Sequence, residues 1–175
     1  MRARLALALL WLVHWLPVRW QVAVGAAAGA LLYRLSAARR RVADRNIALC
    51  LPELDAAARA RLVREHFRWL GRSLVERGLL WYAPRERIVR LIEVEGDVHL
   101  AERSDAPVMW LVPHFMALEV AAAAAQLFQS RRGATIYQAQ SNPVFDAAVR
   151  AGRLRFGGSE LFARSDSAKP LIRAI

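Results

Sequence analysis

Cysteines and metal-ligand clusters are nearly absent from this chain of 175 residues. Cys50 is the one cysteine, so no intrachain disulfide can form, and no group of cysteines and histidines has the spacing of a zinc site. The paired glycines Gly157 and Gly158 predict a tight turn, because the sequence around them lacks the spacing of a P-loop. The sequence therefore predicts a protein that faces the cytoplasm and carries no metal.

A long uninterrupted apolar run is also missing. A membrane-spanning helix needs about 20 consecutive apolar residues. Residues 5–16 and 20–33 are two shorter runs, separated by Pro17 and Arg19. One helix through both would bury Arg19 and His14, and a central arginine costs roughly 2.5–3.5 kcal/mol. We therefore expect a helix or re-entrant hairpin that lies in the membrane interface.

Residues 1–38 are accordingly predicted to form an N-terminal membrane anchor. Trp11, Trp15 and Trp20 suit the level of the lipid headgroups, where tryptophan is enriched. A cleaved signal peptide is the alternative, because the three alanines at 26–28 resemble a cleavage site. Arginines at both ends of the segment and the single cysteine favour a retained anchor, either monotopic or single-pass.

Lysine is almost absent, although the chain is strongly basic. Of 26 basic residues only Lys169 is a lysine, and the net charge is +11. Such an arginine bias is typical of a GC-rich genome, so an arginine at any one position is not taken as evidence of selection for a function. The charge itself suits an anionic membrane surface. The arginines are scattered along predicted helices without a nucleic-acid-binding motif, which argues against DNA or RNA as a partner.

Residues 39–175 predict one α/β domain, which begins with a long helix. Asp55 is a good N-cap for a helix that reaches Tyr82 and ends before Pro84. Apolar residues recur along it near helical spacing, namely Leu62, Phe67, Leu70, Leu74 and Trp81. The other face is predicted to meet solvent or phospholipid, and it carries Arg61, Arg64, Arg68 and Arg72.

Strands and helices are expected to alternate in the rest of the chain. Short strands are predicted at residues 92–95, 108–112, 134–138 and 160–163. Helices are predicted after His114, from Asn142-Pro143 to about Arg153, and after a cap at Ser165 or Asp166. This order predicts a mostly parallel sheet flanked by helices, with sites at the strand ends. The chain stops without a closing strand, so we expect the C-terminal part of the fold to be missing.

His114 and Glu119 form an H-x4-E pair where the apolar run 108–112 gives way to an alanine-rich stretch. A histidine near neutral pKa with a carboxylate within reach can take a proton from a hydroxyl. Five residues along one helix diverge by about 140°. His114 must therefore precede the first helical turn and Glu119 lie inside it. Pro113 favours that arrangement, because it interrupts the strand just before His114.

Five motifs occur in one order along the chain. They are Arg-Asn-Ile-Ala-Leu-Cys-Leu-Pro-Glu at 45–53, His-Phe-Met-Ala-Leu-Glu at 114–119, Ser-Asn-Pro-Val-Phe-Asp at 141–146, Arg-Phe-Gly-Gly at 155–158 and Leu-Phe-Ala-Arg-Ser-Asp at 161–166. Together they resemble the lipid A biosynthesis late acyltransferases, within the wider lysophospholipid acyltransferase group. The resemblance covers residues 39–175, whereas the N-terminal segment agrees only in character.

The resemblance implies an enzyme that moves an acyl chain from acyl carrier protein onto a hydroxyl of a lipid A precursor. It places the reaction at the cytoplasmic face of the bacterial inner membrane and implies no cofactor. It assigns His114 as general base and Glu119 as its partner. The alternative acceptor is another lysolipid, such as an ornithine lipid or lysophosphatidic acid. A truncated, non-catalytic membrane-associated remnant is the other alternative, because family chains continue further.

Three further residues are candidates for substrate binding. Arg164 matches an arginine of the family's later motif, which implies contact with a phosphate or with the thioester oxygen; the other interpretation is a solvated arginine. Asn142 is predicted either to orient a ligand or to cap the helix that Pro143 begins. Asp166 is predicted either to bind a ligand or to act as a cap, and Asp146 is predicted to be structural.

Overall fold

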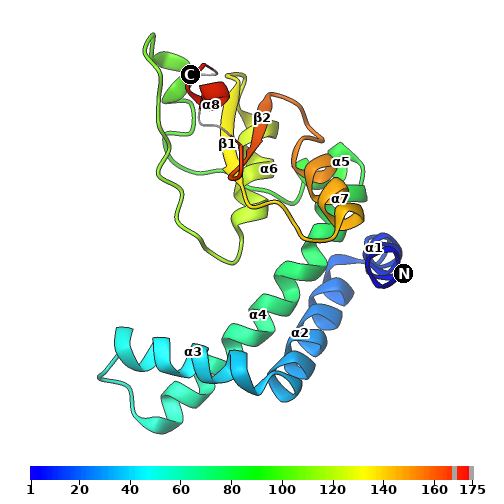
Figure 1. The fold of residues 1–175 in the computed structure, drawn as a ribbon, viewed down its shortest axis with the longest axis vertical. Coiled ribbons are helices and arrows are strands. Elements are labelled where there is room, and N and C mark those ends of the chain that lie inside the picture. The colour runs from blue at the N-terminus through cyan, green and yellow to red at the C-terminus, as the bar shows by residue number, and fades with distance from the viewer. Residues whose placement is uncertain (167–168, 174–175) are drawn as a thin grey trace. The chain divides into compact units, whose positions relative to one another are not determined.

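A computed structural model describes residues 1–166 and 169–173 (Figure 1). The chain divides into two compact units, one formed by Val13–Glu76 and the other by Met1–Leu12 with Arg77–Ile175. Within the described ranges the protein is mostly helical and has a single two-stranded parallel sheet. The predicted α/β class is therefore confirmed in outline, with a much smaller sheet than expected.

The unit Val13–Glu76 is helical. Its elements are α2 (Val18–Leu35), α3 (Ala37–Cys50) and most of α4 (Ala56–Tyr82). The Gln21 amide is buried and donates to the carbonyl oxygens of Leu16 at 2.8 Å and His14 at 3.2 Å. These bonds satisfy carbonyl groups next to Pro17, where the predicted interruption of the apolar segment is confirmed.

Helices α2 and α4 approach each other closely through glycine. A Cβ added at Gly71 of α4 would lie 2.1 Å from the Gly25 carbonyl oxygen and 2.4 Å from the Gly29 nitrogen. A Cβ at Gly29 would lie 2.1 Å from the Phe67 carbonyl oxygen. The two backbones are therefore in contact, as in other helix pairs with small residues at the interface.

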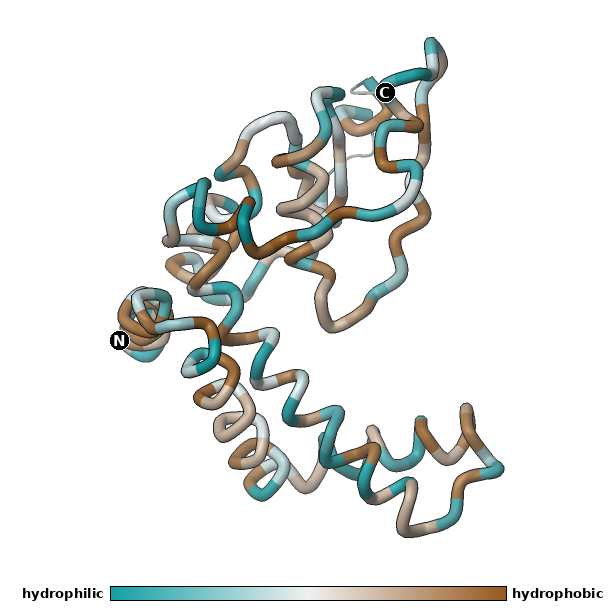
Figure 2. Tube along the Cα trace, turned by 180° about the vertical axis from the view of Figure 1, so that it is seen from behind, coloured by the Kyte–Doolittle hydropathy of each residue, from teal (hydrophilic) through white to brown (hydrophobic). Residues whose placement is uncertain are grey.

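Hydropathy differs between the two helices (Figure 2). Hydrophobic residues dominate α2, whereas hydrophilic residues recur along α4, consistent with its row of arginines.

No helix within residues 1–166 and 169–173 combines the length and the apolar character required to cross a membrane.

The predicted limits of α4 are confirmed. Asp55 Oδ1 accepts a hydrogen bond of 2.6 Å from the Ala58 backbone N–H, which is the expected N-cap, and the helix ends at Tyr82. The predicted apolar face is correct at Phe67 and Trp81, which are buried. It is wrong at two leucines, because the buried stripe runs through neighbouring positions; Leu62 and Leu74 are 38% and 36% exposed.

The second unit combines the first helix of the chain with the α/β region. Its described elements are α1 (Arg2–Val13), α5 (Arg85–Val89), the 3₁₀ helix η1 (Ala101–Arg103), α6 (Leu118–Phe128), β1 (Gly133–Tyr137), α7 (Pro143–Arg153), β2 (Ser159–Ala163) and α8 (Lys169–Arg173). Its core forms around the C-terminal turns of α4, where Trp81 and Ile88 pack with Ala123 of α6 and Val149 of α7.

Strands β1 and β2 are parallel and are connected by α7. Their register runs from Gly133 opposite Ser159 to Tyr137 opposite Ala163. This strand–helix–strand unit confirms the strands predicted at 134–138 and 160–163, and also the helix that was predicted to end near Arg153. Tight-turn geometry precedes β2, because Gly157 and Gly158 both have positive φ.

Two predicted strands are wrong. Residues 92–95 and 108–112 form no strand, and the described part of the chain offers them no strand partner. The Ile92 N–H bonds to the Ile88 carbonyl oxygen and so extends the turn after α5. Met109 and Leu111 are 91% and 95% exposed, so the apolar run 108–112 has no buried face that would fix a register.

The last predicted helix is present as α8, which starts at Lys169. Its predicted caps at Ser165 and Asp166 lie before residues 167 and 168, which are outside the described residues. The division into residues 1–38 and 39–175 remains a prediction.

The glycine contact between α2 and α4 predicts that a glycine-to-alanine substitution in a helix will lower stability instead of raising it. Alanine in a helix interior normally stabilises by about 1 kcal/mol relative to glycine. Gly71→Ala should instead destabilise the protein by roughly 1–3 kcal/mol, because the new methyl group overlaps backbone atoms. Urea unfolding measures the change. Gly133→Ala is the control, since its nearest neighbour would lie at an ordinary 3.9 Å. A stabilising Gly71→Ala would contradict the close approach.

Candidate active site

His114 lies in residues 104–117, a segment without helix or strand that connects η1 to α6. Its side chain is exposed. The Phe115 N–H bonds to the Pro113 carbonyl oxygen at 2.9 Å, and the Leu118 N–H bonds to the Phe115 carbonyl oxygen at 3.2 Å. These turns bring the chain into α6. The prediction that His114 precedes the first helical turn is confirmed.

Glu119 lies in the first turn of α6, as predicted, and its side chain is only 12% exposed. Arg153, the last residue of α7, binds it with two hydrogen bonds, Nε to Oε2 at 3.1 Å and Nη2 to Oε1 at 2.5 Å. Arg77 of α4 places Nη2 at 3.9 Å from the same Oε1. Three helices therefore meet at one carboxylate, which two guanidinium groups neutralise.

The structure does not bring His114 and Glu119 into contact. Among the described residues, no hydrogen bond or ion pair joins them, and the Glu119 carboxylate faces the two arginines. An ionised carboxylate has about four acceptor positions, and the bonds from Arg153 occupy two of them. Glu119 therefore retains the capacity to accept a bond from an imidazole N–H.

Arg155 fixes the chain just after α7. Its guanidinium donates to the Leu80 carbonyl oxygen at 2.8 Å and to the Ala83 carbonyl oxygen, and so satisfies carbonyl groups at the end of α4. Burial lowers the pKa of Arg155. Because Arg153 is two residues away, the same anchor helps to hold its guanidinium against Glu119.

A second polar cluster lies at the C-terminal end of β1. Asp146 accepts from the Tyr137 hydroxyl at 3.1 Å and from the Gln140 N–H at 2.7 Å, which confirms its predicted structural role. Arg150 donates to the same hydroxyl at 3.0 Å, and its guanidinium lies 5.4 Å from the centre of the Tyr137 ring. The hydrogen bond with Tyr137, together with the charges of Asp146 and Asp166, raises the pKa of Arg150.

Asn142 has the geometry of a cap. Its Oδ1 accepts from the N–H groups of Val144 and Phe145, both at 3.1 Å, and Pro143 follows as the first helical residue. The helix-cap interpretation is therefore confirmed, and the role in ligand orientation remains a prediction.

Arg164 and Asp166 follow β2 at the corresponding edge of the sheet. The Arg164 N–H bonds to the Tyr137 carbonyl oxygen at 2.8 Å, and its side chain is exposed. Asp166 closes a turn, because its Oδ2 accepts from the Ala163 N–H at 3.1 Å and its own N–H donates to the Ala163 carbonyl oxygen at 2.9 Å. Both residues lie just after the carboxyl end of β2, and α/β proteins commonly bind ligands at this edge of a parallel sheet.

The two arginines that bind Glu119 were not predicted from the sequence. Arg153 ends an amphipathic helix, where a basic residue is typical because it complements the helix dipole. Arg77 is one of many arginines on α4. Neither position carries a local signal, since the partner of each arginine lies on another helix. Within the described ranges no group of three or more potential ligands could hold a metal ion.

The family model for bacterial lipid A biosynthesis acyltransferases matches residues 2–175. The chain belongs to this family. It is 32% identical over 173 residues to the lipid A biosynthesis lauroyltransferase of Escherichia coli (strain K12), a match that covers 98% of this chain and 55% of that protein. The resemblance carried by the five sequence motifs is thereby confirmed.

Two other relatives from the same organism have similar sequence identity to this chain. The lipid A biosynthesis palmitoleoyltransferase is 31% identical over 151 residues, covering 85% of this chain and 49% of that protein. The lipid A biosynthesis myristoyltransferase is 32% identical over 161 residues, covering 91% and 49%. The chain spans about half the length of the relatives it matches. No solved structure gives a significant match.

Because the Glu119 carboxylate is nearly buried, replacing its partner Arg153 should lower the stability of the protein. Arg153→Gln removes two charge-assisted bonds from Glu119 and leaves Arg77 at 3.9 Å. We expect a loss of about 2 kcal/mol in urea unfolding, the typical cost of a buried group left without its partner. Arg132→Gln, which breaks an exposed pair with Glu160, should cost less than about 0.5 kcal/mol. Equal losses would show that the pair between Arg153 and Glu119 stabilises the protein no more than an exposed pair does.

The cap of α7 predicts an order of stability for substitutions at position 142. Asn142→Ala removes the acceptor for two backbone N–H groups and should lower stability by about 1 kcal/mol. Asn142→Asp keeps an acceptor oxygen and should stay close to the natural protein. Thermal unfolding of the three proteins tests this order. An alanine variant as stable as asparagine would show that the cap contributes nothing.

Proposed function

We propose that the protein transfers a fatty acyl chain from acyl carrier protein to a hydroxyl of a lipid A precursor, with His114 as the general base and Glu119 as its partner. The observation that carries this proposal is where His114 and Glu119 lie in this chain, which belongs to the acyltransferase family. His114 lies exposed directly before α6, and Glu119 is fixed in the first turn of that helix by Arg153.

In the proposed reaction the acceptor hydroxyl attacks the thioester carbonyl directly. His114 takes the hydroxyl proton as the new carbon–oxygen bond forms. The carbon–sulfur bond then breaks, and the imidazolium returns the proton to the thiolate of the carrier. Ester and free thiol are the products, so no protein nucleophile and no oxidant or reductant is needed.

Glu119 acts on His114 rather than on the substrates. A carboxylate bonded to one imidazole nitrogen fixes the tautomer and stabilises the imidazolium, as in a serine-protease triad. The proposal requires His114 to reach one of the free acceptor positions of Glu119 in the complex with its substrates. Catalytic hydrogen bonds commonly tighten in this way when substrates bind.

Arg164 is proposed to bind the anionic part of a substrate, either a phosphate or the thioester oxygen as it becomes negative. Its exposed guanidinium follows the carboxyl end of β2, where α/β proteins commonly bind ligands, and a guanidinium binds phosphate with two charge-assisted bonds. Asn142 and Asp166 are proposed to contact substrate at the same edge, in addition to their structural bonds.

The reaction is proposed to occur at the cytoplasmic face of the bacterial inner membrane, with the protein bound to the interface. The support is physical. Trp11, Trp15 and Trp20 are each at least half exposed, and the net charge of +11 favours anionic headgroups.

An acyl-transfer assay in membranes tests the proposed function. The donor is acyl carrier protein with a labelled chain, and the acceptor is a lipid A precursor. His114→Ala should lower kcat by about 10²–10⁴-fold, the usual value of a general base. His99→Ala is the matched control, because His99 pairs with Glu102 on an exposed surface. Transfer that persists unchanged in His114→Ala would exclude the proposed base, and transfer only to another lysolipid would change the acceptor.

A further inference from the structure

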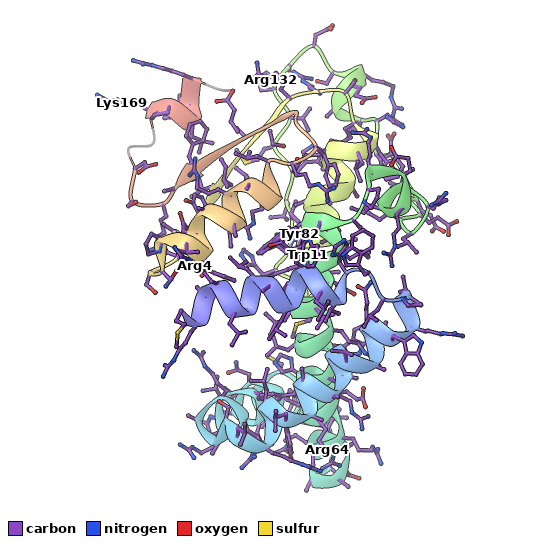
Figure 3. All side chains as sticks on the ribbon, turned by 90° about the vertical axis from the view of Figure 1, so that its right-hand side faces the viewer. Arg4, Trp11, Arg64, Tyr82, Arg132 and Lys169 are labelled. Atoms are coloured by element: carbon purple, nitrogen blue, oxygen red, sulfur yellow. The ribbon has the colours of Figure 1, made fainter. Side chains whose placement is uncertain are left out.

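The N-terminal half of α4 forms a basic hollow in the unit Val13–Glu76. An open cavity of about 580 Å³ is bordered by Arg61, Arg64 and Arg68. Ala58, Leu62, Glu65 and Arg68 follow one another at intervals of three and four residues, so one face of the helix forms the lining. Figure 3 shows Arg64 on this part of α4.

The charge of the hollow is largely uncompensated. Glu65 is its one acidic residue, and it is bonded to Arg68 at 2.7 Å. Arg61 and Arg64 are exposed, and in the described part of the chain no ion pair involves either side chain. Two guanidinium groups on a stable helix are therefore available to a partner with carboxylate or phosphate groups.

The hollow also has apolar surface. Leu54 and Leu62 contribute to the lining, and both are partly exposed. Arginines next to partly exposed leucine side chains fit an acidic helix that presents a few apolar side chains between its carboxylates. Charged and apolar side chains occur together in protein–protein interfaces.

A lipid bilayer fits this hollow less well than a protein does. No tryptophan or tyrosine lines the hollow, although aromatic side chains are typical of membrane interfaces. Of the exposed tryptophans in the same unit, Trp15 and Trp20 lie before and within α2, and Trp69 lies on α4 outside the lining of the hollow.

We propose that the hollow formed by Arg61, Arg64, Arg68 and Leu62 is the docking surface for an acidic carrier protein. This inference rests on the proposed function, because the carrier of the donor thioester is the acidic protein that the reaction requires. The hollow recognises the protein part of the donor.

Direct binding tests the proposal without depending on catalysis. Fluorescently labelled acyl carrier protein is titrated with the natural chain, with Arg61→Glu/Arg64→Glu, and with Arg85→Glu/Arg90→Glu as a control of equal charge change on exposed positions of α5 and its end. The Kd should rise about tenfold in the hollow variant and less than about twofold in the control. Arg61→Gln/Arg64→Gln gives an intermediate value and guards against misfolding of the reversed variant.

Vesicles with anionic phospholipid form the second arm. The hollow variant should bind them like the natural chain. Lost vesicle binding with unchanged carrier binding would overturn the proposal in favour of a lipid surface. Equal loss of both would show an unselective anionic surface, and unchanged binding of both would exclude the hollow, so either result also overturns it.

Activity separates this inference from the proposed function. With the carrier thioester as donor, the hollow variant should show a KM raised about tenfold and a nearly unchanged kcat. With an acyl-pantetheine thioester, which lacks the carrier protein, its rate should equal that of the natural chain. If the natural chain transfers from neither donor, the proposed function fails, and the binding titration alone decides on the hollow.

Discussion

The neutralisation of one nearly buried carboxylate determines how the α/β unit is assembled. Glu119 is removed from most solvent, and an unpaired ion in that position costs several kcal/mol. Arg153 and Arg77 meet this requirement from two other helices. Because the bonds from Arg153 are bidentate, they fix orientation as well as distance. The C-terminal part of α4 is therefore held against α6 and α7 by these charges as well as by apolar packing.

Residues 152–155 show how tightly this arrangement is specified. Gly152 lies against the Trp81 indole so closely that an added Cβ would be 2.3 Å from a ring carbon. The next residue, Arg153, binds Glu119, and Arg155 binds two carbonyl oxygens at the end of α4. A shift of α7 along its axis would break a steric fit, an ion pair and a helix-end contact together. The core around Trp81 therefore depends on the same short segment as the carboxylate.

The elements that were predictable from sequence have local signals. Asp55 and Asn142 are caps whose acceptor oxygens bond to N–H groups two or three residues away, so the sequence around them contains both partners. The segment 108–112 has a strand-like composition but no buried face, and composition alone does not show whether a partner strand exists. Likewise, the arginine that binds Glu119 is 34 residues away from it and is specified only by the packing of α6 on α7. The position of Glu119 in the first turn of α6 was predictable from the sequence, and the environment of its carboxylate was not.

The two residues of the proposed dyad are fixed to very different degrees. Glu119 is held by arginines from two other helices, whereas His114 lies in an exposed segment without helix or strand. Fixing one backbone residue costs about 1–2 kcal/mol. Leu111 and Phe115 flank His114 and are exposed, and burial of apolar area stabilises by about 25 cal/mol per Å². In the proposed reaction an acyl chain packed on these two side chains would offset the cost of ordering His114. Catalysis would then be coupled to the apolar part of the substrate, with Glu119 as the preformed half of the site.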